Sequence, residues 1–353
     1  MRVLSLALAI AVFGAQPDSP RPSFEEFLAG IRTEALARGI RAEILDEALA
    51  NIAEPSAVVI ERDRSQAETV FSLEKYLARR LTPRLAGKGR EMLALHRDLL
   101  EQIGGQYGFP PQFIVAIWGS ESNYGRFSGV RPTIGALATL AWDPRRSTLF
   151  RGELFDALDI LNRGDIEFER LKGSWAGAMG QVQFMPSSYL KFAEDFDGDG
   201  RRDIWGTDAD IFASIANYMT GHGWTSGETW GREVKAAPEV LRRVADEVER
   251  RQGTCRASRN MTIALPVASW HALGVRTLSG APLPASTPQA ALVVGDTRAF
   301  LVYRNYDALL EYNCSHAYAI SVALLADSIA GTDPLPQPRK AKKTARPRPA
   351  KPR

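Results

Sequence analysis

Residues 110–125 read PPQFIVAIWGSESNYG, an apolar run that begins with two prolines and leads to a single glutamate, Glu121. Proline suits the first turn of a helix, because the amide proton that it lacks would have no partner there. Counting back three, four and seven residues from Glu121 gives Trp118, Ile117 and Ile114, which share its face on a helix. The pattern predicts a helix whose apolar face ends in one carboxyl group.

Glu121 occupies an unusual place for a charged residue. Apolar neighbours destabilise the ionised form of a carboxyl group, so its pKa rises and it can hold a proton for use as a general acid. The alternative, a solvated glutamate at a frayed helix end, stays open from this segment alone. The nearest acid downstream is Asp143, in the loop-like WDPRR. If Glu121 is catalytic, this spacing indicates a mechanism with a single carboxyl group.

Length and composition indicate a soluble globular protein, since 353 residues of which 45% are hydrophobic can form two or three lobes. Residues 1–15 combine an early positive charge with an apolar run from Val3 to Phe13, the layout of a secretory signal peptide. A buried N-terminal helix is the alternative, and the run is too short to span a bilayer. In an exported protein we expect the two cysteines, Cys255 and Cys314, to form a disulfide.

The C-terminal segment 332–353 is basic and rich in Pro, Ala and Lys. Between Arg339 and Arg353 it carries eight Lys or Arg and no acid, so removing these eight from the net charge of +3 leaves −5 for the rest of the chain. Such a segment cannot bury enough apolar surface to fold, and we expect it to be disordered. It is either a solvated extension or a contact for an anionic polymer such as cell-wall phosphate. No pattern of a nucleic-acid-binding fold accompanies it, so no specific nucleic-acid partner is expected.

Apolar periodicity divides the chain between these two ends. Segments such as FEEFLAGIRTEALARGI have apolar residues three and four apart, which is the spacing of helices. Thr, Val, Pro and Gly then become more frequent, and ALVVGD and AFLVYR look like short strands. The predicted fold class is mainly α, with a helical N-terminal lobe at 20–105, a helical core at 106–220, a small mixed insertion with some β structure at 221–303 and a helix that returns to the core at 304–331.

A second motif, GSWAGAMGQVQFMPSSYL at 173–190, alternates small residues with Ser174, Gln181 and Gln183. Glycine and alanine let a backbone approach a ligand closely, and neutral amide and hydroxyl groups suit sugar hydroxyl and N-acetyl groups. The segment is therefore a candidate carbohydrate cleft, and a tightly packed helix junction is the alternative. Nearby aromatic residues could stack on sugar rings, although core packing is the commoner role.

A third motif, DFDGDGRRDIWGTDAD at 195–210, matches the spacing of a calcium loop, with Gly200 at the turn. Position twelve of such a loop is normally glutamate but here is Gly206, so closure is expected from Asp208 or Asp210. Carboxylates this close repel one another without a counter-ion, which favours structural Ca²⁺ over a solvated acidic turn. The predicted ligands are Asp195, Asp197, Asp199, the main-chain carbonyl of Arg201, Asp203 and Asp210. No organic cofactor is expected.

Together these motifs resemble the lytic murein transglycosylase B family. The resemblance rests on GSESNYG, GSWAGAMGQVQFMPSSY, the calcium-like loop followed by ANYM and HGW, and YRNYDALLEYNCSHAYA, and it runs from about Phe24 to Ile329. It implies a lysozyme-like helical catalytic core that acts on peptidoglycan, with Glu121 as the catalytic acid and base. It also implies substrate contacts in the cleft for Ser174, Gln183, Asn313, Tyr76, Tyr312 and Tyr318.

The resemblance further implies the reaction, the partners and the location. Glu121 would protonate the bridging oxygen of a MurNAc–GlcNAc β-1,4 bond while the N-acetyl oxygen of the substrate stabilises the sugar cation. Its carboxylate would then act as base toward the muramyl 6-hydroxyl, giving a 1,6-anhydro product without water. A muramidase-type hydrolase of the same fold and a non-catalytic cell-wall-binding module are the alternatives. The expected partners are glycan strands and proteins of cell-wall synthesis or degradation.

Many members of the family are lipoproteins, but this chain has no lipidation cysteine near its start. We therefore expect a periplasmic form that is not lipid-anchored.

Overall fold

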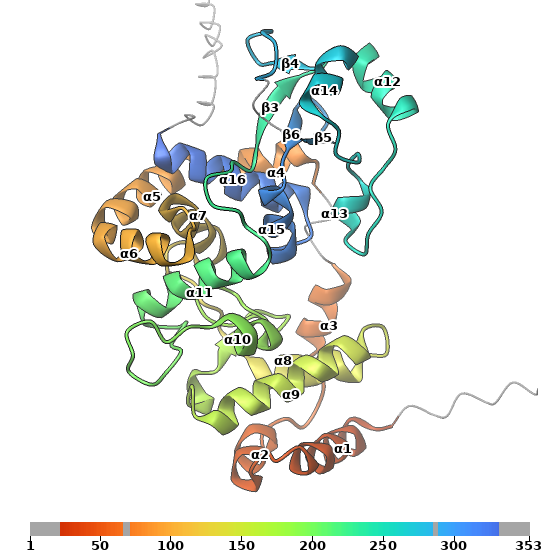
Figure 1. Ribbon diagram of the computed structural model, residues 1–353. Helices are drawn as coiled ribbons and strands as arrows, with labels where there is room; N and C mark the ends of the chain where they lie inside the picture. Colours follow the sequence, from red (N-terminus) through yellow and green to blue (C-terminus); the bar gives the residue numbers. More distant parts are fainter. Residues whose placement is uncertain (1–21, 66–70, 285–288, 332–353) are drawn as a thin grey trace, which may run out of the picture.

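The computed structural model describes residues 22–65, 71–284 and 289–331, so the predicted signal peptide and the predicted tail lie outside the described residues. Helices make up most of the described chain (Figure 1). They are α1 (Phe24–Ala37), α2 (Ala42–Leu49), α3 (Ala57–Arg64), α4 (Leu73–Arg80), α5 (Pro83–Leu95), α6 (Arg97–Tyr107), α7 (Pro111–Ser122), α8 (Thr133–Trp142), α9 (Ser147–Arg163), the 3₁₀ helix η2 (Phe168–Arg170), α10 (Pro186–Phe192), α11 (Asp208–Gly221), α12 (Pro238–Glu247), α13 (Arg256–Arg259), α14 (Val267–Leu273), α15 (Asn305–Tyr312) and α16 (His316–Ala330). The strands are β1 (Arg131–Pro132), β2 (Lys172–Gly173), β3 (Gly231–Lys235), β4 (Arg276–Thr277), β5 (Ala291–Val294) and β6 (Ala299–Val302).

Helix α7 lies at the centre of the helical part. Its residues 113–119 are all buried, because α5, α6, α11 and α16 pack against it from several directions. The sequence predicted one apolar face, whereas the helix is enclosed on every face, as a helix that is apolar all round requires. Only near its last turn do side chains become half-exposed, and Glu121 is one of these.

The first helices divide between two packing environments. Helices α1, α2 and α3 lie against α8 and α9, in the lower part of Figure 1, while α5 and α6 lie against α7. Between them, α4 packs on α16. The N-terminal helices therefore brace both sides of the helical core.

Residues 231–302, called here the β lobe, contain a four-stranded antiparallel sheet in the order β4-β3-β6-β5. Side chains alternate between the two faces of a strand. Leu292 and Leu301 accordingly belong to a small core with Trp270 of α14, while Val293 and Phe300 pack into the main core. Both faces are covered, which explains why β5 and β6 read as continuous apolar runs rather than alternating ones.

The predicted fold class, mainly α with an insertion that contains β structure, is confirmed. Short breaks interrupt the helices within the predicted N-terminal lobe and core. His96 separates α5 from α6, and residues 143–146 separate α8 from α9, where Pro144 disfavours a helical Asp143. Strand β3 and helix α12 were not anticipated, although Pro238 and the four-residue spacing of Val240, Val244 and Val248 are typical of a helix.

Within the described residues, no helix combines the length and the apolar character that crossing a bilayer requires.

Candidate functional site

The turn that follows α7 decides where Glu121 lies. The helix ends at Ser122, and the next residues, Asn123, Tyr124 and Gly125, have φ angles of 51°, 59° and 77°. Left-handed conformations at residues other than glycine cost about 1–3 kcal/mol each and gather at functional sites. Hydrogen bonds hold this turn, since the Ser122 hydroxyl accepts from the Gly125 amide at 3.0 Å. Helix α7 therefore ends one residue after Glu121.

The side chain of Tyr124 locks the same turn onto the core. Its ring lies over Gly119, where an added Cβ would be 2.5 Å from ring atoms. Its hydroxyl donates to the Leu85 carbonyl at 2.8 Å. The glycine and the tyrosine of GSESNYG are thus structural requirements of the turn that presents Glu121.

The Glu121 carboxylate meets two tyrosines that come from the other end of the chain. The Tyr318 hydroxyl, in the first turn of α16, donates to Glu121 Oε1 at 2.5 Å. The Tyr312 ring stacks on that of Tyr318, with centroids 6.2 Å apart and planes at 16°. The Tyr312 hydroxyl donates to the Val182 carbonyl at 2.6 Å, which joins this wall to the small-residue motif.

Burial keeps these phenols protonated. It raises the pKa of both Tyr318 and Tyr312 well above the usual value, and the negative charge of Glu121 adds to the rise. Tyr76 of α4 lies close enough to Tyr318 to contribute to the raised Tyr318 pKa. A protonated phenol is a hydrogen-bond donor, so Tyr318 can orient Glu121 throughout the neutral pH range. The apolar surroundings predicted for Glu121 thus include one hydroxyl donor.

The small-residue motif is held against the loop after α7 by glycines. A Cβ on Gly129 would lie 2.2 Å from the carbonyl carbon of Gly173, so the two backbones touch. Ser174 follows Gly173, and its hydroxyl oxygen accepts from the amides of Ala176 at 3.2 Å and Ala178 at 3.1 Å. The hydroxyl is thereby fixed in place with its proton available for donation.

Gln183 and Gln181 belong to the same motif but have different hydrogen-bond partners. Gln183, with a φ of 52°, donates from Nε2 to the Gly180 carbonyl at 2.8 Å and the Ser128 carbonyl at 3.3 Å. Gln181 Oε1 instead accepts from the Trp118 indole at 2.7 Å, and its Nε2 donates to the Trp205 carbonyl at 2.8 Å. Gln181 therefore ties α7 to the acidic loop and is not a free donor for a sugar.

Asn313 follows Tyr312 directly and ends α15 in an extended conformation. Of the predicted substrate residues, Tyr318 contacts Glu121 directly, Tyr312 stacks on Tyr318, and Tyr76 lies near Tyr318. Gln183 and Ser174 belong to the small-residue motif, to which Tyr312 is bonded, and their contact with a sugar stays a prediction, as does that of Asn313.

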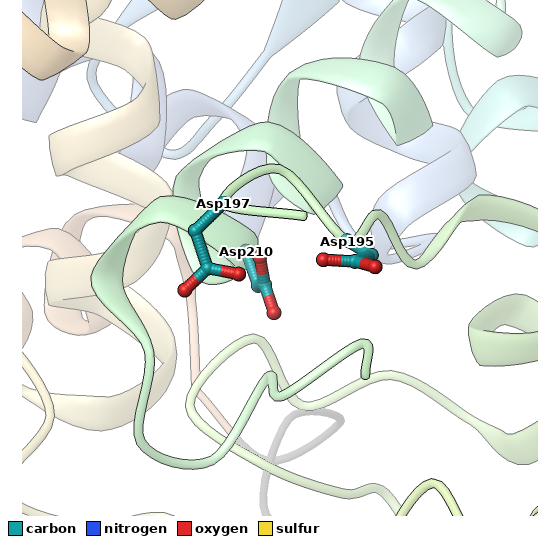
Figure 2. A group of neighbouring side chains, drawn as sticks. All are labelled: Asp195, Asp197 and Asp210. Atoms are coloured by element: carbon teal, nitrogen blue, oxygen red, sulfur yellow. The ribbon is translucent and has the colours of Figure 1, made fainter. Parts of the chain in front are cut away.

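In the acidic loop, Asp195, Asp197 and Asp210 turn their carboxylates toward one another, with one oxygen of each within 4.8 Å of the others (Figure 2). Asp210 is fully buried, and its two oxygens accept from the amides of Phe196 at 2.7 Å and Asp203 at 2.8 Å. Burial raises the pKa of Asp210 to about 6, and the charges of Asp197 and Asp195 add to the rise. Such a set of carboxylate oxygens fits a hard cation.

Other predicted ligands in this loop have different partners. Asp199 accepts from the amide of Arg201 at 2.8 Å, and Asp203 Oδ1 accepts from the amides of Trp205 and Gly206, both at 2.9 Å. Short aspartate side chains commonly cap their own turns in this way, and Asp195 does so too, accepting from the amides of Gly198 and Gly200, both at 2.9 Å. What distinguishes Asp195, Asp197 and Asp210 is that their carboxylate oxygens converge. The structure does not bring Asp199 and Asp203 into the group.

The Arg201 guanidinium pairs with Glu167 at 3.1 Å, which leaves the predicted role of its main-chain carbonyl a prediction. Asp208 lies 3.5 Å from His96. Of the two closing residues considered for the loop, it is Asp210 that joins the group.

Comparison with known proteins identifies the family of this chain. The family model for the transglycosylase SLT domain matches residues 23–327. The chain belongs to the transglycosylase SLT domain family. The resemblance that the motifs indicated is thereby confirmed.

Several relatives of this SLT-domain chain are characterised. Membrane-bound lytic murein transglycosylase B of Escherichia coli (strain K12) is 41% identical over 155 residues, which are 44% of this chain and 43% of that protein, less than half of its length. SltB3 from Pseudomonas aeruginosa, in complex with NAG-anhNAM-pentapeptide, has a TM-score of 0.78 at 40% identity and covers 88% of this chain and 80% of its own. Slt35 of Escherichia coli, in complex with calcium, has a TM-score of 0.71 at 29% identity and covers 88% and 93%.

In this SLT-domain chain Cys255 and Cys314 form a disulfide, with their Cα atoms 5.7 Å apart. The bond attaches the loop after α12 to Cys314, the residue that follows Asn313. Nearby, His316 Nδ1 lies 2.8 Å from the Tyr306 hydroxyl, and burial lowers the pKa of His316 to about 4. The start of α16 therefore excludes positive charge.

The sequence did not single out two further acids. Glu153 of α9 is 7% exposed and accepts from the Ser187 amide at 3.0 Å and the Ser187 hydroxyl at 2.8 Å, so it anchors the start of α10. Glu74 of α4 accepts from the amides of Thr297 at 2.8 Å and Arg298 at 3.1 Å, and thereby ties the helix that carries Tyr76 to the β lobe. No local pattern could reveal Glu74, because its partners lie more than two hundred residues away.

Proposed function

We propose that this chain is a peptidoglycan lytic transglycosylase, a lyase that cleaves the β-1,4 bond between MurNAc and GlcNAc and leaves a 1,6-anhydroMurNAc end. The observation that carries the proposal is Glu121, half-buried at the end of α7 and held at Oε1 by the Tyr318 hydroxyl. The nearest acid downstream, Asp143, pairs with the Arg145 guanidinium at 2.8 Å. One carboxyl group therefore performs both proton transfers.

The first step breaks the glycosidic bond. Glu121 gives its proton to the bridging oxygen, and the bond between that oxygen and C1 of MurNAc breaks, with its electrons going to the leaving GlcNAc. The carbonyl oxygen of the substrate's N-acetyl group bonds to C1 and disperses the positive charge.

The second step closes the anhydro ring. The Glu121 carboxylate removes the proton of the muramyl 6-hydroxyl, whose oxygen attacks C1 and displaces the N-acetyl oxygen. Glu121 is again protonated, and no water is consumed. Because ring closure depends on orientation, the groups that hold the sugar contribute strongly to the rate.

Substrate positioning falls to the residues around Glu121. Ser174, with its fixed hydroxyl, and Asn313 hold the N-acetyl arm, while Tyr318 orients the Glu121 carboxylate. The further residues that line the glycan site are Gln183, Tyr76 and Tyr312. The ligand of SltB3 supports this substrate and product, since it is an anhydro sugar linked to a pentapeptide.

We also propose that the acidic loop binds a structural Ca²⁺ through Asp195, Asp197 and Asp210. The converging carboxylate oxygens and the raised pKa of buried Asp210 support a cation there, as does the calcium complex of Slt35. The ion would balance the carboxylate charges and attach the loop to the start of α11. It takes no part in the sugar chemistry.

Export to the periplasm completes the proposal. A disulfide persists in an oxidising compartment, so the bond between Cys255 and Cys314 supports this location. There the chain would act on glycan strands alongside proteins of cell-wall synthesis or degradation. The basic segment 332–353 could contact an anionic wall polymer.

The test is the release of soluble fragments from purified peptidoglycan sacculi. Glu121→Gln keeps the shape of the side chain and removes the proton donor, so we expect at least about a thousandfold loss of activity with glycan binding retained. Glu311→Gln, an exposed carboxylate of α15 next to Tyr312, is the matched control and should keep activity. Substantial lysis by Glu121→Gln would exclude Glu121 as the acid.

A further inference from the structure

A cavity lies between the β lobe and the start of α15, and Glu121 is not part of its lining. It has a volume of about 940 Å³ and is called here the β-lobe pocket. Its apolar lining includes Met261, Ile263 and Val302. Its polar lining includes three arginines: Arg232, Arg251 and Arg304.

The Arg232 guanidinium is held ready for a ligand. Its Nε donates to the Tyr303 hydroxyl at 2.7 Å, and its guanidinium carbon lies 5.8 Å from the centre of the Tyr303 ring. Tyr303 is only 7% exposed, so it provides a rigid support. Within the described chain, the terminal nitrogens of Arg232 form no hydrogen bond or ion pair. A planar guanidinium fixed at Nε offers those nitrogens as a fork that matches a carboxylate.

The charges around the pocket leave positive charge uncompensated. Arg251 pairs with Asp307 at 2.5 Å, so these two charges balance. Arg304 is exposed and, among the described residues, forms no ion pair. The other acid of the lining, Glu228, is also exposed and forms no ion pair with a described residue. Arg232 and Arg304 thus provide positive charge beside an apolar surface, which suits a ligand with carboxylates and alkyl groups.

We propose that the β-lobe pocket binds a carboxylate-bearing peptide with alkyl side chains and that, if the proposed function holds, this peptide is the stem peptide of the peptidoglycan substrate. The guanidinium groups of Arg232 and Arg304 take its carboxylates, and Met261, Ile263 and Val302 take its alkyl groups.

Helix α15 connects this pocket to the residues proposed to bind the glycan. Arg304 and Asn313 stand at its two ends, nine positions apart, which is about 14 Å along a helix. An extended peptide of five residues spans about 17 Å. A stem peptide on a sugar in or beside the cleft can therefore extend to the pocket.

The experiment compares two probes by calorimetry on the full chain. One is a synthetic stem pentapeptide with free carboxylates, and the other is the same peptide with those carboxylates amidated. We expect the free acid to bind at least tenfold more tightly. Arg304→Gln, an exposed position that leaves the fold intact, should lower its affinity several-fold, and the double variant Arg232→Gln/Arg304→Gln at least tenfold. Equal binding of the two peptides, or unchanged affinity in both variants, would overturn the proposal.

Cleavage of peptide-free glycan separates this proposal from the proposed function. Neither arginine belongs to the cleft, so the variants should cleave peptide-free strands within about twofold of the wild-type rate. If wild type cleaves peptide-free glycan but the two peptides bind equally, only the peptide site is wrong. If wild type does not cleave glycan at all, the proposed function fails whichever peptide binds.

Discussion

The surroundings of Glu121, with the neutral side chains of Tyr312 and Tyr318, differ in charge from the acidic loop at 195–210. Around Glu121, burial keeps the phenols of Tyr312 and Tyr318 neutral, so they add no charge there. Burial also keeps His316 neutral at the start of α16, the helix that carries Tyr318. In the loop, three carboxylates converge and one of them is fully buried.

This difference shows that the partners of a carboxylate decide its role. A single acid held by a neutral phenol can lose and regain a proton, which general acid and base catalysis requires. Three converging acids repel one another until a cation joins them, which suits a structural ion. The same residue type thus serves chemistry in one region and stability in the other.

The largest expected effect tests whether the start of α16 excludes positive charge. Burial lowers the pKa of His316 from 6.5 to about 4. Between these values the unfolded chain binds more protons, so the stability contributed by the neutral imidazole is present above pH 6.5 and is lost as the pH falls to about 4. The loss is about 3 kcal/mol. Denaturant unfolding across this pH range should show a shallower fall in His316→Asn than in wild type, and parallel curves would contradict the assignment.

The next effect tests whether the loop needs a cation. At free Ca²⁺ about a hundred times Kd, binding to the folded state stabilises it by about 2.7 kcal/mol, seen as a higher thermal midpoint than in chelator. Asp195→Asn should abolish this shift, because Asp195 belongs to the converging group. Asp199→Asn is the matched control and should keep it, since Asp199 caps a turn as Asp195 does but does not belong to the converging group. Equal midpoints with calcium and chelator in wild type would refute the site.

The smallest effect tests the phenol that holds Glu121. Tyr318→Phe removes the hydroxyl that donates to Oε1, and a hydrogen bond to a charged group contributes about 1.5–3 kcal/mol. We expect kcat to fall about tenfold with little change in KM. Tyr312→Phe, whose hydroxyl bonds to the Val182 carbonyl, should affect kcat less. A kcat for Tyr318→Phe equal to that of wild type would remove Tyr318 from the mechanism.

The fold could be predicted from the sequence wherever local patterns govern it. Apolar spacing and prolines sufficed for α7, and continuous apolar runs sufficed for β5 and β6. The break between α5 and α6 could not be foreseen, because His96 is held by long-range packing against Trp118 and Phe212.

The site was predictable only in part for the same reason. The motif around Glu121 could be recognised because its glycines and its turn are local. The contact of Tyr318 with Glu121 spans 197 residues, and the role of Gln181 depends on Trp118 and Trp205. In the acidic loop, spacing alone could not show which aspartates converge, because Asp195 and Asp197 cap turns just as Asp199 and Asp203 do.

The central claim is that the Glu121 carboxylate removes the proton of the muramyl 6-hydroxyl during ring closure. The most direct test is the mass of the glycan ends produced from purified sacculi. Transglycosylation gives 1,6-anhydroMurNAc ends, each lighter by one water than a hydrolysed end. We expect wild type to give anhydro ends throughout the digestion and Glu121→Gln to give none. Reducing MurNAc ends as the main product of wild type would contradict the claim and indicate a hydrolase.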